Sequence, residues 1–306
     1  MACAQGALGQ LAMKEGSGAI DFSSGSSFFP FYRESIKKVG KIVHPDVILG
    51  TREEVSERAR KTPYFYGGWV VLNLTPGDAA TLLPWALGAD ASGTTFALAE
   101  TLQTIGVIVD KVTGVHEFYN GVVNRAIVTG RQNGPGGRPN WVTFALQIYF
   151  RSYLAPGASE AFPTASYAVT GAYAPLVFED AVLTLASASR EVKSFTLDIN
   201  NYVQPRWVNN LEATALCPGH RTINFNAVVP YDSGTSALYD AALAGVSGNL
   251  AITNGTVSTT FTFATYQIDT ETPEIRGKQE LDLVLSGAIR KSGSTSSLVV
   301  TNDSTI

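Results

Sequence analysis

The sequence predicts a mainly β protein with short helices (β+α), built as two tandem copies of one unit. Three observations support this prediction. The 306-residue chain is 45% hydrophobic and 16% charged and holds 29 glycines, a balance that favours strands and turns over long helices. Several stretches alternate apolar and polar residues with the period of two that is typical of half-buried strands. The order strand, helix, strand, strand also occurs twice along the chain.

The first copy of the unit begins with an alternating strand at 68–74, GWVVLNL. A helix is expected to follow over 75–88. Thr75 is a suitable N-cap, and Pro76 is tolerated at the first helical position because its missing N–H would be unsatisfied there anyway. Pro84 should kink this helix or end it early.

The second copy repeats this order. A strand at 220–231 is followed by a helix expected over 232–245, and an alternating strand at 194–200 opens the copy. The stretches 117–152 and 260–292 are built alike: each has an aromatic-led strand, a turn containing Gly or Pro, and an alternating strand that ends in arginine. The sequence therefore predicts that both copies end in a pair of strands.

The stretch rich in Ala, Ser, Pro and Tyr between the copies indicates the domain boundary. The predicted division is an N-terminal arm, a first β domain, a linker and a second β domain, over 1–44, 45–155, 156–175 and 176–306. The spacing between corresponding elements varies along the two copies, as expected if loops take up insertions that packed elements do not tolerate.

Both ends of the chain leave alternatives open. The cluster of Phe28, Phe29 and Phe31 in the N-terminal arm is either a local satellite of the core or part of an arm that docks on an adjacent subunit. The C-terminal VVTNDSTI is either a frayed tail or a final pairing strand.

Charge and motifs argue against several classes of function. A net charge of −4 argues against a protein that grips nucleic acid through a clustered basic surface. The three histidines lie in unrelated contexts, and Cys3 and Cys217 are expected to be unpaired thiols, so we expect no metal, cofactor or histidine-based catalysis. Glu280 and Asp282 could form the carboxylate pair of a hydrolase, but a wetted sheet face explains them better, and we predict no enzyme. No secretion signal or membrane anchor is expected.

A charge-dense segment precedes the first strand. It is either a solvated loop or a protruding loop that pairs with another subunit, and its mixed signs suit self-complementary contacts. The candidate inter-subunit or inter-ring residues are Arg52, Glu53, Glu54, Glu57, Arg58, Arg60 and Lys61. The corresponding segment of the second copy lies at 200–221.

The strand–helix–strand–hairpin unit, with LTPGDAATLLPWALG, TTFALAETL, LYDAALAG, LAITNG and AIRKSG, resembles the tail tube (major tail) proteins of long-tailed bacteriophages over 45–300. The resemblance implies β-sandwich or half-barrel units of the tail-tube type, each with one packed helix. It also implies a structural virion protein that stacks as rings into a channel through which the genome passes into the host. A duplicated subunit would build such a ring from three chains, each copy supplying one sixth of the wall.

The resemblance makes the polar strand faces candidates for the channel lining. The candidate lumen-facing residues are Thr143, Gln147, Arg151, Thr222, Asn224, Asn226, Glu280, Asp282, Ser286 and Arg290. A lining that DNA must slide past should not bind phosphates, so we expect it to be net negative.

The implied partners are further copies of the chain, in stacked rings of three or six, and the tape measure, terminator and tail-tip proteins. DNA would pass through without specific binding. The resemblance places the protein in the phage tail of the virion, after synthesis and assembly in the host cytoplasm. The alternatives are a β-rich receptor- or carbohydrate-binding virion or tail protein, and another tail component of the same fold.

Overall fold

The computed structural model describes residues 5–44, 56–89, 93–134, 140–169, 171–232, 234–235, 238, 244–269, 275 and 280–304. Antiparallel strands dominate this part of the chain, which confirms the expectation of a mainly β fold. It holds one continuous α-helix, α1 (Pro76–Leu87), further helical residues at Gly234, Thr235 and Leu238, and short 3-10 helices at Gly6–Leu8, Ser56–Arg58, Gly171–Tyr173 and Phe178–Asp180. Arg52, Glu53, Glu54 and most of the helix expected over 232–245 lie outside the described residues, as does the side chain of Glu57.

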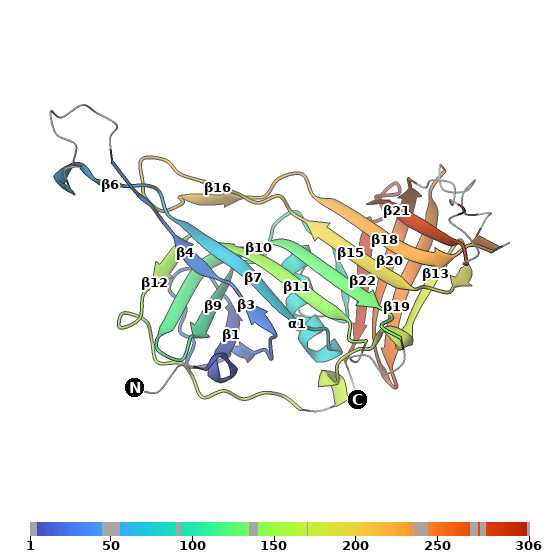
Figure 1. Ribbon diagram of the computed structural model, residues 1–306, viewed down its shortest axis with the longest axis horizontal. Coiled ribbons are helices and arrows are strands. Elements are labelled where there is room, and N and C mark those ends of the chain that lie inside the picture. The colour runs from blue at the N-terminus through green and yellow to red at the C-terminus, as the bar shows by residue number, and fades with distance from the viewer. Residues whose placement is uncertain are drawn as a thin grey trace.

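A central sheet crosses the molecule and joins its two halves (Figure 1). All its neighbours are antiparallel, and the strands follow one another in space in the order β7 (Phe65–Asn73), β11 (Thr143–Phe150), β10 (Val115–Arg131), β15 (Ser194–Asn200), β18 (Thr222–Pro230) and β21 (Asp282–Arg290). The sheet passes from the first half of the chain to the second where β10 pairs with β15.

Further strands flank each end of the central sheet. At the first end, the early part of β10 pairs with β9 (Ile105–Asp110) and β12 (Ser152–Leu154), and the set continues through β1 (Gln10–Glu15) to β2 (Ser27–Phe28). At the other end, β20 (Val257–Ile268) pairs with β19 (Val246–Asn254) and with β22 (Leu298–Asp303). β19 then pairs with β13 (Ala181–Leu185), which pairs with β14 (Ala188–Arg190), and β22 pairs with β8 (Thr95–Ala97). The order of pairing is therefore β1–β9–β10–β11–β7 at the first end and β13–β19–β20–β21–β18 at the other.

Short strands complete the fold. β3 (Arg33–Glu34) and β4 (Lys37–Val39) pair with β7 at the edge of the central sheet. β5 (Ile42–Val43) pairs with β6 (Arg60–Lys61) in a ribbon that projects from the body at the upper left of Figure 1. A second ribbon, made by β16 (Gln204–Arg206) and β17 (Ala215–Cys217), lies along the central sheet.

The helix α1 covers one face of the central sheet and completes the core. Its ends follow the expected capping, because Thr75 Oγ1 accepts a hydrogen bond from the N–H of Asp78, and Gly88 adopts a left-handed conformation (φ 79°) that glycine tolerates. The helix does not end early at Pro84 but continues to Leu87. One hydrophobic cluster packs α1 against both halves of the chain, from Leu11 to Val300.

The aromatic cluster of the N-terminal arm and the C-terminal strand both contact the rest of the fold. Phe29 is buried and contacts the Trp85 ring edge-on, whereas Phe28 is half-buried and contacts Phe162 and Tyr167. Of the alternatives for this cluster, the contacts therefore match the local satellite of the core. The C-terminal stretch forms β22, a pairing strand.

A buried asparagine ties the two halves together. Asn201, which follows β15, is 1% exposed, and its Nδ2 donates to the carbonyl oxygens of Ala86 (3.1 Å) and Val123 (2.9 Å). Its Oδ1 accepts from Nε of Arg221 (2.6 Å), whose Nη2 donates to the carbonyl of Ala99 (2.8 Å). Burial lowers the pKa of the Arg221 guanidinium, and these acceptors compensate for the lost water.

No helix in the described part of the chain is long and apolar enough to cross a membrane.

Candidate functional site

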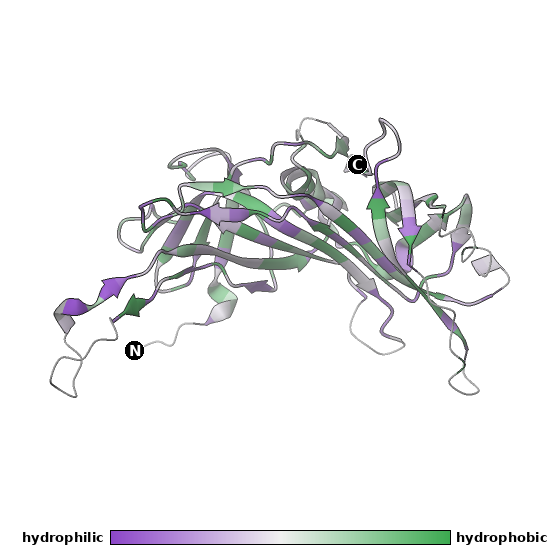
Figure 2. Ribbon diagram, turned by 90° about the horizontal axis from the view of Figure 1, so that it is seen from above, coloured by the Kyte–Doolittle hydropathy of each residue, from purple (hydrophilic) through white to green (hydrophobic). Residues whose placement is uncertain are grey.

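The central sheet has one face that packs on the core and one that faces water. Along β11, Phe144, Leu146 and Ile148 are buried against the core, while Thr143 and Gln147 point the other way and stay partly exposed. We call this second side, turned away from α1, the open face. Figure 1 looks onto it with α1 behind the sheet, and Figure 2 shows the sheet as an arch whose concave side is the open face.

A continuous row of uncharged polar side chains crosses the open face. The strand register places six residues directly next to one another, one from each strand of the central sheet: Asn73, Thr143, Thr129, Thr196, Asn226 and Ser286. We call them the polar row. Neighbours in it bond to each other, because Thr129 Oγ1 lies 2.5 Å from Thr143 Oγ1 and Ser286 Oγ donates to Asn226 Oδ1 (2.6 Å). The row offers hydroxyl and amide groups and no formal charge.

Ion pairs lie on either side of the polar row. Arg125 donates to Asp198 through both Nε (2.7 Å) and Nη2 (2.6 Å), and this bidentate hydrogen bond raises the pKa of the guanidinium. The carboxylates of Glu280 and Asp282 both bind the ammonium group of Lys193, at 2.5 and 2.6 Å, and these hydrogen bonds raise the pKa of Lys193. The carboxylate pair therefore shares a cation on a wetted surface and is not arranged as an acid and base around a substrate.

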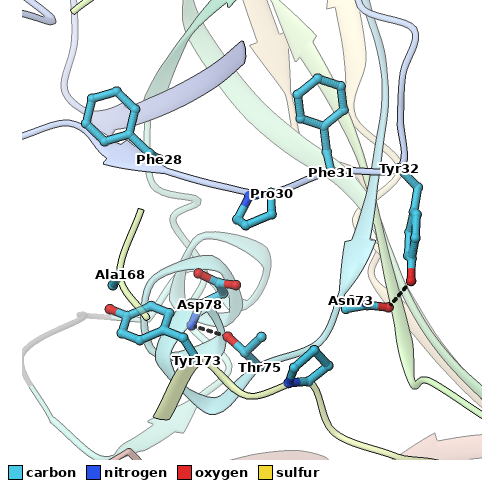
Figure 3. A pocket seen from close by; sticks show the side chains of 10 residues that line it. Phe28, Pro30, Phe31, Tyr32, Asn73, Thr75, Asp78, Ala168 and Tyr173 are labelled. Carbon is cyan, nitrogen blue, oxygen red and sulfur yellow. Dashed lines mark hydrogen bonds between the residues drawn. The ribbon is translucent and has the colours of Figure 1, made fainter. Parts of the chain in front are cut away.

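A small cavity of about 140 Å³ lies at the N-terminal end of α1 (Figure 3). Aromatic rings and prolines form most of its wall, which consists of Phe28, Pro30, Phe31, Tyr32, Asn73, Thr75, Asp78, Ala168, Tyr173 and Pro175. The hydroxyl of Tyr32 donates to Asn73 Oδ1 (2.7 Å), and Asp78 is only 5% exposed. No cluster of three or more His, Cys, Asp or Glu that could hold a metal ion occurs in the described residues. This cavity therefore offers one carboxyl group in an apolar setting.

Replacing Asp78 with asparagine is expected to stabilise the protein at neutral pH. Burial raises the pKa of this carboxyl from 3.8 to about 6, so the folded protein binds a proton that the unfolded chain releases between these values. Its contribution to stability is therefore greatest below pH 4 and is lost as the pH rises through 6, a change of about 3 kcal/mol at most. Urea unfolding of both proteins from pH 4 to 7 would measure this.

The variant should lose that part of the pH dependence and gain unfolding free energy at pH 7. Glu15→Gln, at an exposed carboxyl, is the matched control and should change neither quantity. An Asp78→Asn variant that is less stable than the unchanged protein at pH 7 would show that the charged carboxyl is favourable where it lies.

The comparison with protein families decides what kind of protein carries this open face. A family model described as phage tail tube protein matches residues 56–289. The chain belongs to the phage tail tube family. A search of curated proteins found no match. The family assigns the chain a structural role in the bacteriophage tail, places it in the virion, and implies self-association and contact with other tail proteins. Proteins of this family are generally not enzymes.

In this tail tube protein, the sequence-predicted lining residues lie on one side of the sheet. Thr143, Gln147, Asn224, Asn226, Asp282 and Ser286 lie on strands of the open face. Exposed Arg151 directly follows β11, and exposed Arg290 ends β21. Thr222, at the start of β18, is half-buried, and Glu280 precedes β21 beside Lys193.

Residues in the middle of the open face were not predicted from the sequence. Thr129 and Arg125 on β10, Thr196 and Asp198 on β15, and Asn73 on β7 belong to the same face. The sequence did contain a signal for Thr196 and Asp198, because 194–200 alternates apolar and polar residues as clearly as the strands that supplied the candidate lumen-facing residues. The missing information was that β10 and β15 adjoin, which alternation within one strand cannot reveal.

The described residues of the open face do not carry the net negative charge that we expect of a channel lining. Its carboxylates are Asp198, Glu280 and Asp282, whereas its cations are Arg33, Lys37, Arg125, Arg131, Arg151, Lys193 and Arg290. The physical reason is that an acidic overall composition does not determine which face carries the charges. The three carboxylates are paired with Arg125 and Lys193, and the polar row between the ion pairs is uncharged.

Proposed function

We propose that this chain polymerises as stacked rings into the tail tube, and that its open face lines the channel through which the genome passes into the host. The observation that carries the proposal is the polar row, which crosses all six strands of the central sheet on the concave side of the arch. Membership of the tail tube family supports a tube, and the row indicates which face would meet DNA.

The chemistry of the polar row suits passage of DNA better than binding. Proteins hold DNA mainly through Lys and Arg on phosphates, and several such contacts are needed for appreciable affinity. In the middle of the open face, hydroxyl and amide groups are at least partly exposed or bonded to each other, and the Arg125 guanidinium is paired with Asp198. A phosphate chain would therefore meet few available cations along the polar row.

We also propose that the chain contains two copies of the tube unit, over 45–155 and 176–306, so that three chains complete one ring. The equal order of strand pairing at the two ends of the central sheet supports this proposal. Assembly in the host cytoplasm and contacts with tape measure, terminator and tail-tip proteins complete the proposal.

Removing the partner of Arg125 is expected to slow the passage of DNA. Asp198→Ala would leave an unpaired guanidinium beside the polar row in every subunit, and free cations add attraction for phosphates. We expect the rate of DNA release from purified phage to fall about threefold, with recovery at higher salt because salt screens the attraction.

The double variant Arg125→Ala with Asp198→Ala is the matched control, since it removes both charges. It should release DNA at the normal rate. Equal slowing in the single and the double variant would point to altered assembly and would remove the electrostatic explanation.

Negative-stain electron microscopy of the concentrated, purified protein tests the proposed function. Rings or hollow filaments are expected, and their rotational symmetry would decide between three and six chains. A monodisperse monomer under all conditions that assemble other tail tubes would contradict self-assembly and favour the β-rich receptor- or carbohydrate-binding alternative.

A further inference from the structure

Two ribbons occupy matching places in the fold. The β5–β6 ribbon leaves the central sheet after β4 and returns to β7, and the β16–β17 ribbon leaves after β15 and returns to β18. The strands that hold them are paired in the same way: Val39, the last residue of β4, lies opposite Phe65, and Asn200, the last of β15, lies opposite Thr222. Ile42 comes three residues after Val39, and Val203 comes three residues after Asn200, so Ile42 in the first ribbon corresponds to Val203 at the base of the second.

The β16–β17 ribbon is docked on the first half of its own chain. Val203 is 4% exposed and packs in a small cluster with Val122 and Leu102, against which Tyr149 also packs. The N–H of Val203 donates to Asn124 Oδ1 (2.7 Å), a residue of β10. These contacts attach the base of the ribbon to the place where β10 and β11 lie side by side.

The tip of the same ribbon extends the contact along the first half. Trp207 Nε1 donates to the carbonyl of Tyr64 (3.0 Å), and the hydroxyl of Tyr66 donates to Glu212 Oε1 (2.8 Å). Docking on the first half thus combines a buried aliphatic side chain at the base with hydrogen bonds at the tip.

The β5–β6 ribbon carries the same kind of side chains without cover. Ile42 is 65% exposed and Val43 46%, and every residue from Lys37 to His44 is exposed. Within the ribbon, the N–H of Thr62 donates to the carbonyl of Lys41 (2.9 Å). Val203 is covered by the first half of its own chain, whereas the described residues place no such surface over Ile42.

The second half presents the matching surface. In the order of strand pairing, β20 and β21 take the places that β10 and β11 have in the first half. Gln267, which lies opposite Ala288, therefore corresponds to Val122, which lies opposite Tyr149. Asp269 then comes two residues after Gln267, as Asn124 comes two residues after Val122, and it is exposed. Its carboxylate offers the acceptor that Asn124 Oδ1 offers to Val203, and it adds a negative charge for Lys41, the neighbour of Ile42.

We propose that the β5–β6 ribbon of one copy docks on the second half of a neighbouring copy, with Ile42 over Gln267 and Ala288 and the Lys41 region facing Asp269. The contact is lateral, because the docking that it repeats joins the two halves side by side in one sheet. The partner is a second copy of this chain, so this proposal rests on the proposed duplication and ring assembly. Covering Ile42 would also remove an exposed aliphatic side chain from water.

Disulfide cross-linking tests the contact. The background is Cys3→Ser with Cys217→Ser, and the test protein adds Ile42→Cys and Gln267→Cys. Oxidation of the assembled protein should link different chains, giving a ladder on a non-reducing gel that ends at the number of chains in one ring. There are two matched controls. Ile42→Cys alone lacks the second cysteine, and Val43→Cys with Gln267→Cys moves the first thiol to the next residue of the ribbon.

Each outcome is decisive. A ladder in the test protein that greatly exceeds both controls supports the contact. Tubes without cross-links, or cross-links of equal yield in all variants, would overturn it while leaving the proposed function in place. A ladder from a protein that forms no tubes would support the contact and count against the tube, and neither ladder nor tubes would contradict both.

Discussion

Lysines in the polar row are expected to reduce delivery of DNA at least about tenfold while leaving the tube intact, since several added phosphate contacts per ring multiply in their effect on affinity. The change we would make is Thr196→Lys with Ser286→Lys, at two strands separated by β18. Both side chains lie on the open face and reach water, so longer side chains can be accommodated without entering the core. Infectivity and DNA release from phage carrying the variant would measure the effect.

The matched control replaces the same two residues with glutamine. This adds side-chain length without charge, and normal delivery is expected. If the lysine variant assembles and delivers DNA as fast as the unchanged protein, then the open face does not line the channel. A loss that is equal in the glutamine variant would indicate obstruction of the channel by size and not attraction for phosphates.

Loss of the Asn201 side chain is expected to destabilise the fold strongly. In Asn201→Ala, the carbonyls of Ala86 and Val123 and the guanidinium of Arg221 lose a buried partner together. A buried polar group without its hydrogen bond costs about 1–3 kcal/mol, so we expect the free energy of unfolding to fall by about 3 kcal/mol. Urea denaturation of the unassembled protein would measure it.

Asn224→Ala on the open face is the control for this substitution. Asn224 is exposed, so its loss should change the free energy of unfolding by less than about 0.5 kcal/mol. Similar small losses in both variants would show that the Asn201 network is not needed to hold the halves together.

Local patterns in the sequence predicted much of the fold. Alternation at 194–200 corresponds to β15, and the cap and proline that open the helix at Thr75 correspond to the start of α1. Each of these signals lies within about ten residues. It reflects either the alternate burial of side chains along one strand or the capping of an unpaired N–H group at the start of a helix. The pairing of β1 with β9 has no such signal, because its partners are far apart in the sequence.

The candidate site shows the same limit. Alternation correctly predicted that Thr143 and Gln147 share a face, because that depends only on the pleat of one strand. It could not predict that Thr129 and Thr196 lie between Thr143 and Asn226, because register across strands depends on the whole sheet. The charge of the open face could not be predicted for a related reason, since composition counts residues without their positions.

A cryo-electron microscopy reconstruction of the assembled protein tests the central claim most directly. The account predicts a hollow tube of stacked rings in which the polar row, from Asn73 to Ser286, faces the channel and α1 lies on the outer side of the sheet. A tube with α1 turned toward the channel, or an assembly without a channel, would contradict it.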